Sequence, residues 1–113
     1  MLQGCASRPI KQEDTSLVFP NSIEMLKEAA VDALRVYGFK IQKEEPSYIE
    51  GIRAQKWGFF VGSGGETSGV WLEALEQQKT RVYVDTAKSA AGILGQKNWS
   101  SEIMQEIRRN LKQ

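Results

Sequence analysis

The sequence predicts a two-layer α+β domain in which an antiparallel four-stranded meander carries two helices on one face. Residues 22–37 and the segment after Asn98 repeat apolar side chains at helical spacing, whereas the stretch between them alternates apolar and polar residues. Short turn sequences separate the alternating segments, so neighbouring strands are expected to pair as antiparallel hairpins. The expected order of elements is β-α-β-β-β-α.

A chain of 113 residues fits one domain. We expect a flexible N-terminal tether over residues 1–16 and a single α+β domain over residues 17–113. The tether is polar, lacks periodicity and contains Pro9, so little order is expected before Leu17. Fully extended, residues 5–16 span about 40 Å, enough to hold a domain clear of a bilayer surface.

The first predicted helix follows a short apolar strand, Leu17–Phe19, which Pro20 ends. Asn21 is the expected N-cap, and Glu24 three residues later completes a capping-box pattern. One face of the helix is apolar and carries Ile23, Leu26, Ala30, Ala33, Leu34 and Tyr37. Gly38 supplies the left-handed residue that ends the helix, and Phe39 folds back on Leu34 as in a Schellman motif.

The alternating segments after this helix predict the strands. They cover residues 39–43, 48–60, 67–74 and 80–86 in chain order. Gly51 indicates a bulge within its strand, and residues 62–65, which read Gly-Ser-Gly-Gly, are expected to form a flexible hairpin tip.

The C-terminal part predicts a loop and a second helix. Residues 87–97 contain two glycines and a small apolar patch, Ile93 and Leu94. Asn98 or Ser100 is the expected cap of the helix. Its apolar residues recur every four positions and must pack against the rest of the domain: Trp99, Ile103, Ile107 and Leu111.

Composition excludes several classes of partner. Fifteen basic and fourteen acidic residues leave a net charge of +1, whereas nucleic-acid binding is driven by a strong basic excess. The chain has no histidine, which removes the commonest general base and metal ligand. A lone cysteine, Cys5, forms neither an internal disulfide nor a zinc cluster. We therefore expect no nucleic-acid partner, metal or cofactor, and no stretch reaches the roughly 20 apolar residues that span a bilayer.

The motifs that carry reaction chemistry are incomplete. Residues 62–67 come nearest to a phosphate-binding loop, but Glu66 stands in place of the required lysine and a strand follows. The acidic residues read as solvated strand faces, although a cross-strand pair of Glu50 with Glu73 stays open. Ser63, Ser68 and Ser100 lack a base. No enzymatic activity is expected.

Four aromatic residues surround the predicted hairpin: Trp57, Phe59, Phe60 and Trp71. They come together if the hairpin closes at its glycines, with Trp57 and Phe59 on one face and Phe60 on the other. Two interpretations stay open. The rings form core and a cross-strand pair, or Trp57, Phe60 and Trp71 present a docking surface for a protein, peptide or glycan.

Leu2-Gln3-Gly4-Cys5 resembles the end of a bacterial lipobox. This resemblance implies that residues 1–16 are a lipobox remnant and tether, and that Cys5 becomes a lipid-modified N-terminus. Ala6, rather than aspartate, follows the cysteine, which by the same resemblance favours the outer membrane, with the domain in the periplasm. The alternative is an incidental thiol in the tether.

The domain itself resembles small bacterial lipoproteins of unknown function. Three segments carry the resemblance: residues 34–39 (Leu-Arg-Val-Tyr-Gly-Phe), 80–84 (Thr-Arg-Val-Tyr-Val) and 92–100 (Gly-Ile-Leu-Gly-Gln-Lys-Asn-Trp-Ser). It implies a non-enzymatic envelope lipoprotein domain that contacts the membrane through lipid on Cys5 and acts as a binding or scaffolding module, with an envelope protein as a partner.

A second hypothesis is a non-lipidated domain that oligomerises through a sheet edge, with Leu17–Phe19 as the pairing strand. A small hydrolase is a distant third. The sequence leaves the oligomeric state open.

Overall fold

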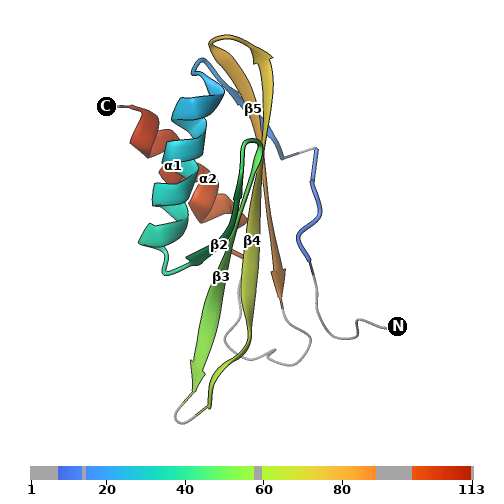
Figure 1. Cartoon of the computed structure of the whole chain (residues 1–113), viewed down its shortest axis with the longest axis vertical. Coiled ribbons are helices and arrows are strands. Elements are labelled where there is room, and N and C mark those ends of the chain that lie inside the picture. The colour runs from blue at the N-terminus through green and yellow to red at the C-terminus, as the bar shows by residue number, and fades with distance from the viewer. Residues whose placement is uncertain (1–7, 14, 58–59, 89–97, 113) are drawn as a thin grey trace.

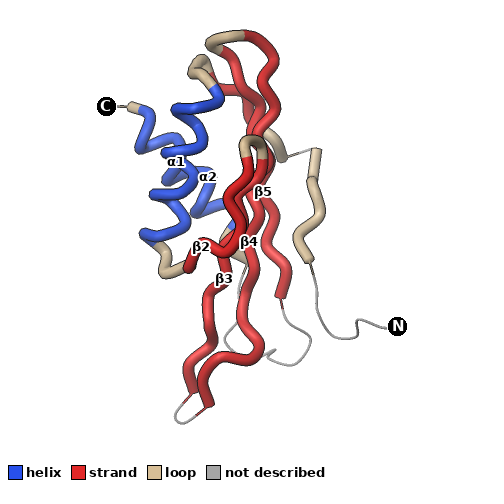
Figure 2. Tube along the Cα trace, viewed as in Figure 1, coloured by secondary structure: helices blue, strands red, loops and turns tan. Residues whose placement is uncertain are grey.

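The computed structural model describes residues 8–13, 15–57, 60–88 and 98–112. Its elements follow in the order β1 (Leu17–Phe19), α1 (Ile23–Val36), β2 (Lys40–Glu45), β3 (Tyr48–Trp57), β4 (Phe60–Glu76), β5 (Lys79–Lys88) and α2 (Ser100–Leu111). The strands pair antiparallel in one sheet of order β1-β5-β4-β3-β2. Both helices lie on the same side of this sheet (Figures 1 and 2).

The α+β class and the placement of two helices on one face are confirmed. The predicted strand count and the order β-α-β-β-β-α are wrong, because the sheet has five strands. The four segments predicted as strands after the helix each overlap one of β2 to β5, and the fifth strand is β1. β1 joins the meander as an edge strand, with Leu17 paired to Val82 and Phe19 to Thr80. Three residues suffice here because Phe19 is buried in the core on the helix side of the sheet.

The β3–β4 hairpin closes at a different place from the predicted one. The two strands pair until Trp57 meets Phe60, so residues 62–65 fall inside β4 instead of forming the tip. The register shifts between Ala54 and Lys56, opposite this glycine-rich stretch. Glycine thus accommodates an irregularity within the ladder, a common use of glycine in strands.

The ends of α1 are set by local sequence. The N-cap is Ser22, whose Oγ accepts a 3.3 Å hydrogen bond from the Met25 N–H, so the predicted cap at Asn21 is wrong by one residue. At the other end Gly38 has a φ of +86°, and the Phe39 N–H donates to the Leu34 carbonyl over 2.9 Å. This bond, with one from the Gly38 N–H to the Arg35 carbonyl, confirms the predicted Schellman motif.

The predicted apolar stripe of α2 is confirmed. Ile103 and Ile107 are fully buried, and Trp99 and Leu111 pack against the core from its margin. The N-cap position is Trp99, without a side-chain cap, while Asn98 Oδ1 accepts the Ser100 N–H over 2.9 Å. The predicted Ile93–Leu94 patch lies outside the described residues.

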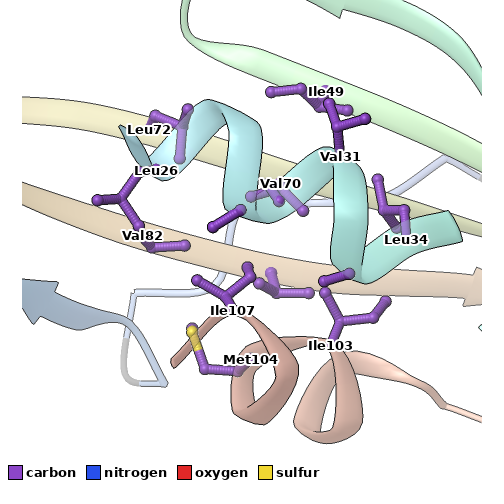
Figure 3. Packing of buried hydrophobic residues seen from close by; sticks show 14 of the residues in the cluster. Leu26, Val31, Leu34, Ile49, Val70, Leu72, Val82, Ile103, Met104 and Ile107 are labelled. Carbon is purple, nitrogen blue, oxygen red and sulfur yellow. The ribbon is translucent and has the colours of Figure 1, made fainter. Parts of the chain in front are cut away.

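The core lies between the helices and the sheet, as Figure 3 shows. Its fully buried members come from both helices and the three central strands: Leu26, Ala30, Ala33, Leu34, Ile49, Val70, Val82, Ile103 and Ile107. Gly51 permits the close approach to β3 of the chain that follows α1, since a Cβ there would lie 3.0 Å from Cβ of Phe39. The bulge predicted at Gly51 lies instead on the partner strand, between Ile41 and Lys43 of β2.

Candidate functional site

The face of the sheet turned away from the helices, called the outer face below, carries an aromatic row. Trp71 of β4 pairs in register with Tyr48 of β3 on one side and with Tyr83 of β5 on the other. Their neighbours Ile49, Val70, Leu72, Val82 and Val84 are buried in the core, so strand alternation places the three rings on the outer face. The rings of Tyr48 and Trp71 lie 5.0 Å apart at an interplanar angle of 41°.

Each tyrosine of the row donates its hydroxyl to a carboxylate. Tyr48 donates to Glu50 Oε1 and Tyr83 to Glu73 Oε1, both over 2.6 Å, and Glu50 Oε2 also accepts a 2.5 Å bond from Gln42. Burial and the bond to Glu50 raise the pKa of Tyr48 well above its usual range. The bond to Glu73, followed by burial, raises the pKa of Tyr83. Both hydroxyls therefore stay protonated and act as fixed donors.

Gly69 lies at the centre of the outer face, beside this row. It pairs with Glu50 on one side and Asp85 on the other. A Cβ at this position would lie 2.7 Å from the Tyr48 hydroxyl oxygen and 3.1 Å from Cβ of Pro9. The absent side chain thus leaves the space in which Tyr48 crosses to Glu50 and the N-terminal segment passes over the sheet.

Residues 8–13, called the strap below, lie against the outer face, on the opposite side of the sheet from the helices (Figure 1). The Ile10 N–H donates to Asp85 Oδ2 over 2.8 Å, and Lys11 Nζ lies 4.6 Å from the centre of the Tyr83 ring. Tyr83 is only 4% exposed. Residues 9–11 thus contact the sheet, where little order was expected before Leu17.

The predicted docking residues are not gathered into one cluster. Trp71 lies half-buried in the aromatic row, whereas Trp57 pairs with Phe60 at the far end of the β3–β4 hairpin. Nine residues separate Trp57 from Tyr48, the partner of Trp71, which corresponds to roughly 30 Å along a strand. The side chains of Trp57 and Phe60 lie outside the described residues, as does Cys5.

Tyr48, Tyr83 and the strap were missed as site components. A signal for the tyrosines is present in the sequence: Tyr48 and Glu50 are two residues apart on one strand, as are Tyr83 and Asp85, so each pair shares a face. No comparable signal marks the strap, because its contacts with the sheet are long-range.

The open cross-strand acid pair is resolved by the register. Glu50 pairs with Gly69, four residues from Glu73 along β4, a separation of roughly 13 Å. Each carboxylate binds the hydroxyl of a different tyrosine. The two acids therefore do not face each other across a cleft. Within the described ranges no cluster of three acidic, cysteine or histidine residues could hold a metal ion.

A second polar cluster lies on the helix side of the sheet. Glu66, 2% exposed, accepts a 3.1 Å bond from Trp99 Nε1 and lies 3.8 Å from Arg53 Nη1. Arg53 also donates Nε to the Tyr37 carbonyl and lies over the Trp99 ring at 4.8 Å. An ion pair with added hydrogen bonds offsets the cost of burying the carboxylate. This cluster joins the start of α2 to the sheet.

A groove of about 810 Å³ separates α2 from β1, β5 and the chain before β1. Its lining is mixed, with Leu17, Val84 and Met104 apolar and Arg108 positively charged. β1 covers β5 only at Thr80, Arg81 and Val82. Among the described residues, no further strand pairs with this edge of β5.

Neither helix of the described part of the chain has the length and apolar character needed to span a bilayer.

Comparison with known proteins gives no family for this chain. No protein-family model matches it, and no curated protein gives a significant match. Among solved structures, a crystal structure of the Zhui aromatase/cyclase from Streptomyces sp. R1128 is 13% identical. That alignment covers 92% of this chain and 86% of the other, with a TM-score of 0.37, which is too low to support an inference.

Proposed function

We propose that this chain is a non-enzymatic binding domain of a bacterial envelope lipoprotein, anchored to the membrane by lipid on Cys5. The observation that carries the binding role is the aromatic row of Tyr48, Trp71 and Tyr83 on a sheet face that no helix covers within the described residues. Aromatic side chains with fixed polar groups beside them are typical of interaction surfaces. The lipid anchor rests on the resemblance of residues 2–5 to a lipobox.

The placement of the strap sets how far such an anchored domain would stand from the bilayer. Because Pro9 already contacts the domain, only residues 6–8 lie between Cys5 and the first contact, a reach of about 13 Å. The full tether to Ser16 would reach about 40 Å. The outer face and the membrane anchor would therefore lie close together while the strap is in place.

The experiment that tests the anchor is mass spectrometry of the protein extracted from membranes of its natural cell. A Cys5 that carries diacylglycerol supports the proposal, and an unmodified Cys5 removes the anchor. A Cys5→Ser variant should leave the membrane fraction, whereas Ser7→Ala, two residues away, should stay there. The outer-membrane location is tested by separating the two membranes of the same cells.

A second candidate function, oligomerisation through a sheet edge without lipid, is favoured by the short β1. Only Thr80–Val82 of β5 pair with β1, and the groove lies beside the rest of that edge. Open edges are templates for pairing with another chain. Light scattering separates the two functions, since a monodisperse monomer at high concentration argues against the oligomer.

A further inference from the structure

We propose that the outer face binds an extended, positively charged segment of a partner protein, and that the strap occupies this site as an internal stand-in. The inference rests on the proposed binding role and names the class of partner.

The strap holds the sheet through its backbone, a proline and a cation. Its contacts are the Ile10 N–H on Asp85, the Pro9 ring beside Gly69, and the Lys11 ammonium over Tyr83. The largest apolar side chain of the strap, Ile10, is 67% exposed and points away. The face therefore contacts main chain, a proline ring and a positive charge, and the Ile10 side chain is not what holds the segment.

The charge of the outer face complements such a segment. Register pairing places five acids on this face: Glu45, Glu50, Glu73, Glu76 and Asp85. The cations on the same face are Lys40, Lys43, Lys79 and Arg81, so the acids outnumber them by one. Glu50 and Glu73 accept hydrogen bonds from neutral side chains, and Asp85 accepts from the strap itself. An ammonium or guanidinium group over an aromatic ring gains further attraction from the ring. Arg8, at the start of the strap, acts on Tyr48 as a nearby positive charge.

The strap is retained weakly enough to be displaced. Residues 8–12 form no regular secondary structure and are exposed apart from Pro9, which is half-buried. The backbone hydrogen bond to Asp85 and the contact of Lys11 with the Tyr83 ring are both weak interactions made by exposed residues of the strap. A segment of similar chemistry from another protein can therefore compete for the same binding site, with the strap acting as a tethered competitor.

The test uses a full-length strap variant with Arg8→Ser, Pro9→Gly, Ile10→Ser and Lys11→Ser. A blocked synthetic peptide of residues 8–13 is titrated into this variant and into the unmodified chain, and amide shifts at Gly69, Trp71 and Tyr83 are followed by NMR. The peptide should bind the strap variant roughly tenfold more tightly than the unmodified chain, because the tethered strap no longer competes. Binding should weaken as salt is raised.

Matched control variants separate specific recognition of the peptide from nonspecific binding. Asp85→Ala in the strap variant should weaken peptide binding several-fold, whereas Asp32→Ala, the same change on the exposed side of α1, should leave it unchanged. A peptide with Gln in place of its Arg and Lys should bind poorly. Equal binding of the neutral peptide, or failure of the cationic peptide to bind a folded strap variant, overturns the proposal.

Two further outcomes are decided in the same experiment. If the strap variant dimerises by light scattering and the peptide does not compete, the face accepts a second copy and the partner class is wrong. If the strap variant does not fold, a milder Arg8→Gln, Lys11→Gln variant is used, which should bind the peptide more tightly than the unmodified chain does. Peptide binding is measured on chain without lipid, so its failure is distinct from the failure of the anchor on Cys5.

Discussion

The hydroxyl of Tyr83 donates a 2.6 Å hydrogen bond to Glu73 on the neighbouring strand. Glu73 lies on the same face of the sheet, two residues after Trp71, the register partner of Tyr83. Tyr48 makes the equivalent bond along its own strand, to Glu50. The two bonds fix the outer pair of rings in the aromatic row and hold two carboxylates on the same face. They also give the sheet a measurable dependence on alkaline pH.

The stability of the domain should fall as pH rises above about 10. Tyrosine in an unfolded chain ionises near pH 10, and the pKa values of both Tyr48 and Tyr83 are raised in the folded chain. The folded state therefore keeps protons that the unfolded state has lost, and this stabilisation, fully present below pH 10, declines as pH rises toward the folded pKa values. Urea unfolding between pH 8 and 11.5 measures it.

A Tyr48→Phe, Tyr83→Phe double variant is the control for this pH dependence. It should show a flatter profile above pH 10, because the two shifted groups are gone. Profiles of equal slope in the double variant and the unmodified chain would contradict the assignment.

Gly69→Ala should destabilise the domain by about 1–2 kcal/mol, the cost of leaving a buried polar group without its partner. The added methyl would meet the Tyr48 hydroxyl oxygen at 2.7 Å, so Tyr48 must move away from Glu50. Thermal or urea unfolding measures the change. In a Tyr48→Phe background the same substitution should cost less, since the bond is already lost. If the free-energy losses of Gly69→Ala and Tyr48→Phe simply add in the double variant, displacement of Tyr48 is not the cause of the Gly69→Ala loss.

Ser22→Ala should cost about 1 kcal/mol of stability, whereas Asn21→Ala should cost less. Ser22 Oγ accepts the Met25 N–H at the start of α1. Asn21 acts through its backbone carbonyl, which accepts the Thr80 hydroxyl over 2.8 Å and which alanine retains. Urea unfolding of the two variants decides which residue is the cap. A larger loss from Asn21→Ala would restore the cap that the sequence suggested.

Leu34→Ala should cost about 2–5 kcal/mol, the range for truncation of a fully buried leucine. Leu34 is 0% exposed and lies in the core (Figure 3), where its Cδ1 would be 3.6 Å from a Cβ at Gly51 of β3. Val36→Ala, two residues further along the same helix, is the matched control, because Val36 is 61% exposed. Its effect should stay within about 0.5 kcal/mol. Similar losses of stability from both substitutions would contradict the orientation of α1, in which Leu34 faces the core and Val36 faces solvent.

Local patterns accounted for the helices and much of the sheet. The helical stripes of α1 and α2 and the Schellman end at Gly38 depend on residues within a few positions of one another, so the sequence predicts them well. The hairpin tip was misplaced because a glycine-rich stretch fits a tip and an irregular strand equally. The pairing of β4 on both sides of this stretch, from Trp57 with Phe60 to Glu66 with Lys88, selected the strand.

The candidate site was harder to predict than the fold. Trp71 was identified by residue type, but its partners Tyr48 and Tyr83 come from strands whose register no local pattern fixes. The order of residues by itself determined the fold class, the two amphipathic helices and the absence of histidine chemistry, since these follow from composition and short-range periodicity. Tertiary structure alone decided that residues 8–13 lie on the outer face. Their contacts at Asp85 and Tyr83 join residues more than seventy positions apart, and such contacts leave no trace in short-range spacing.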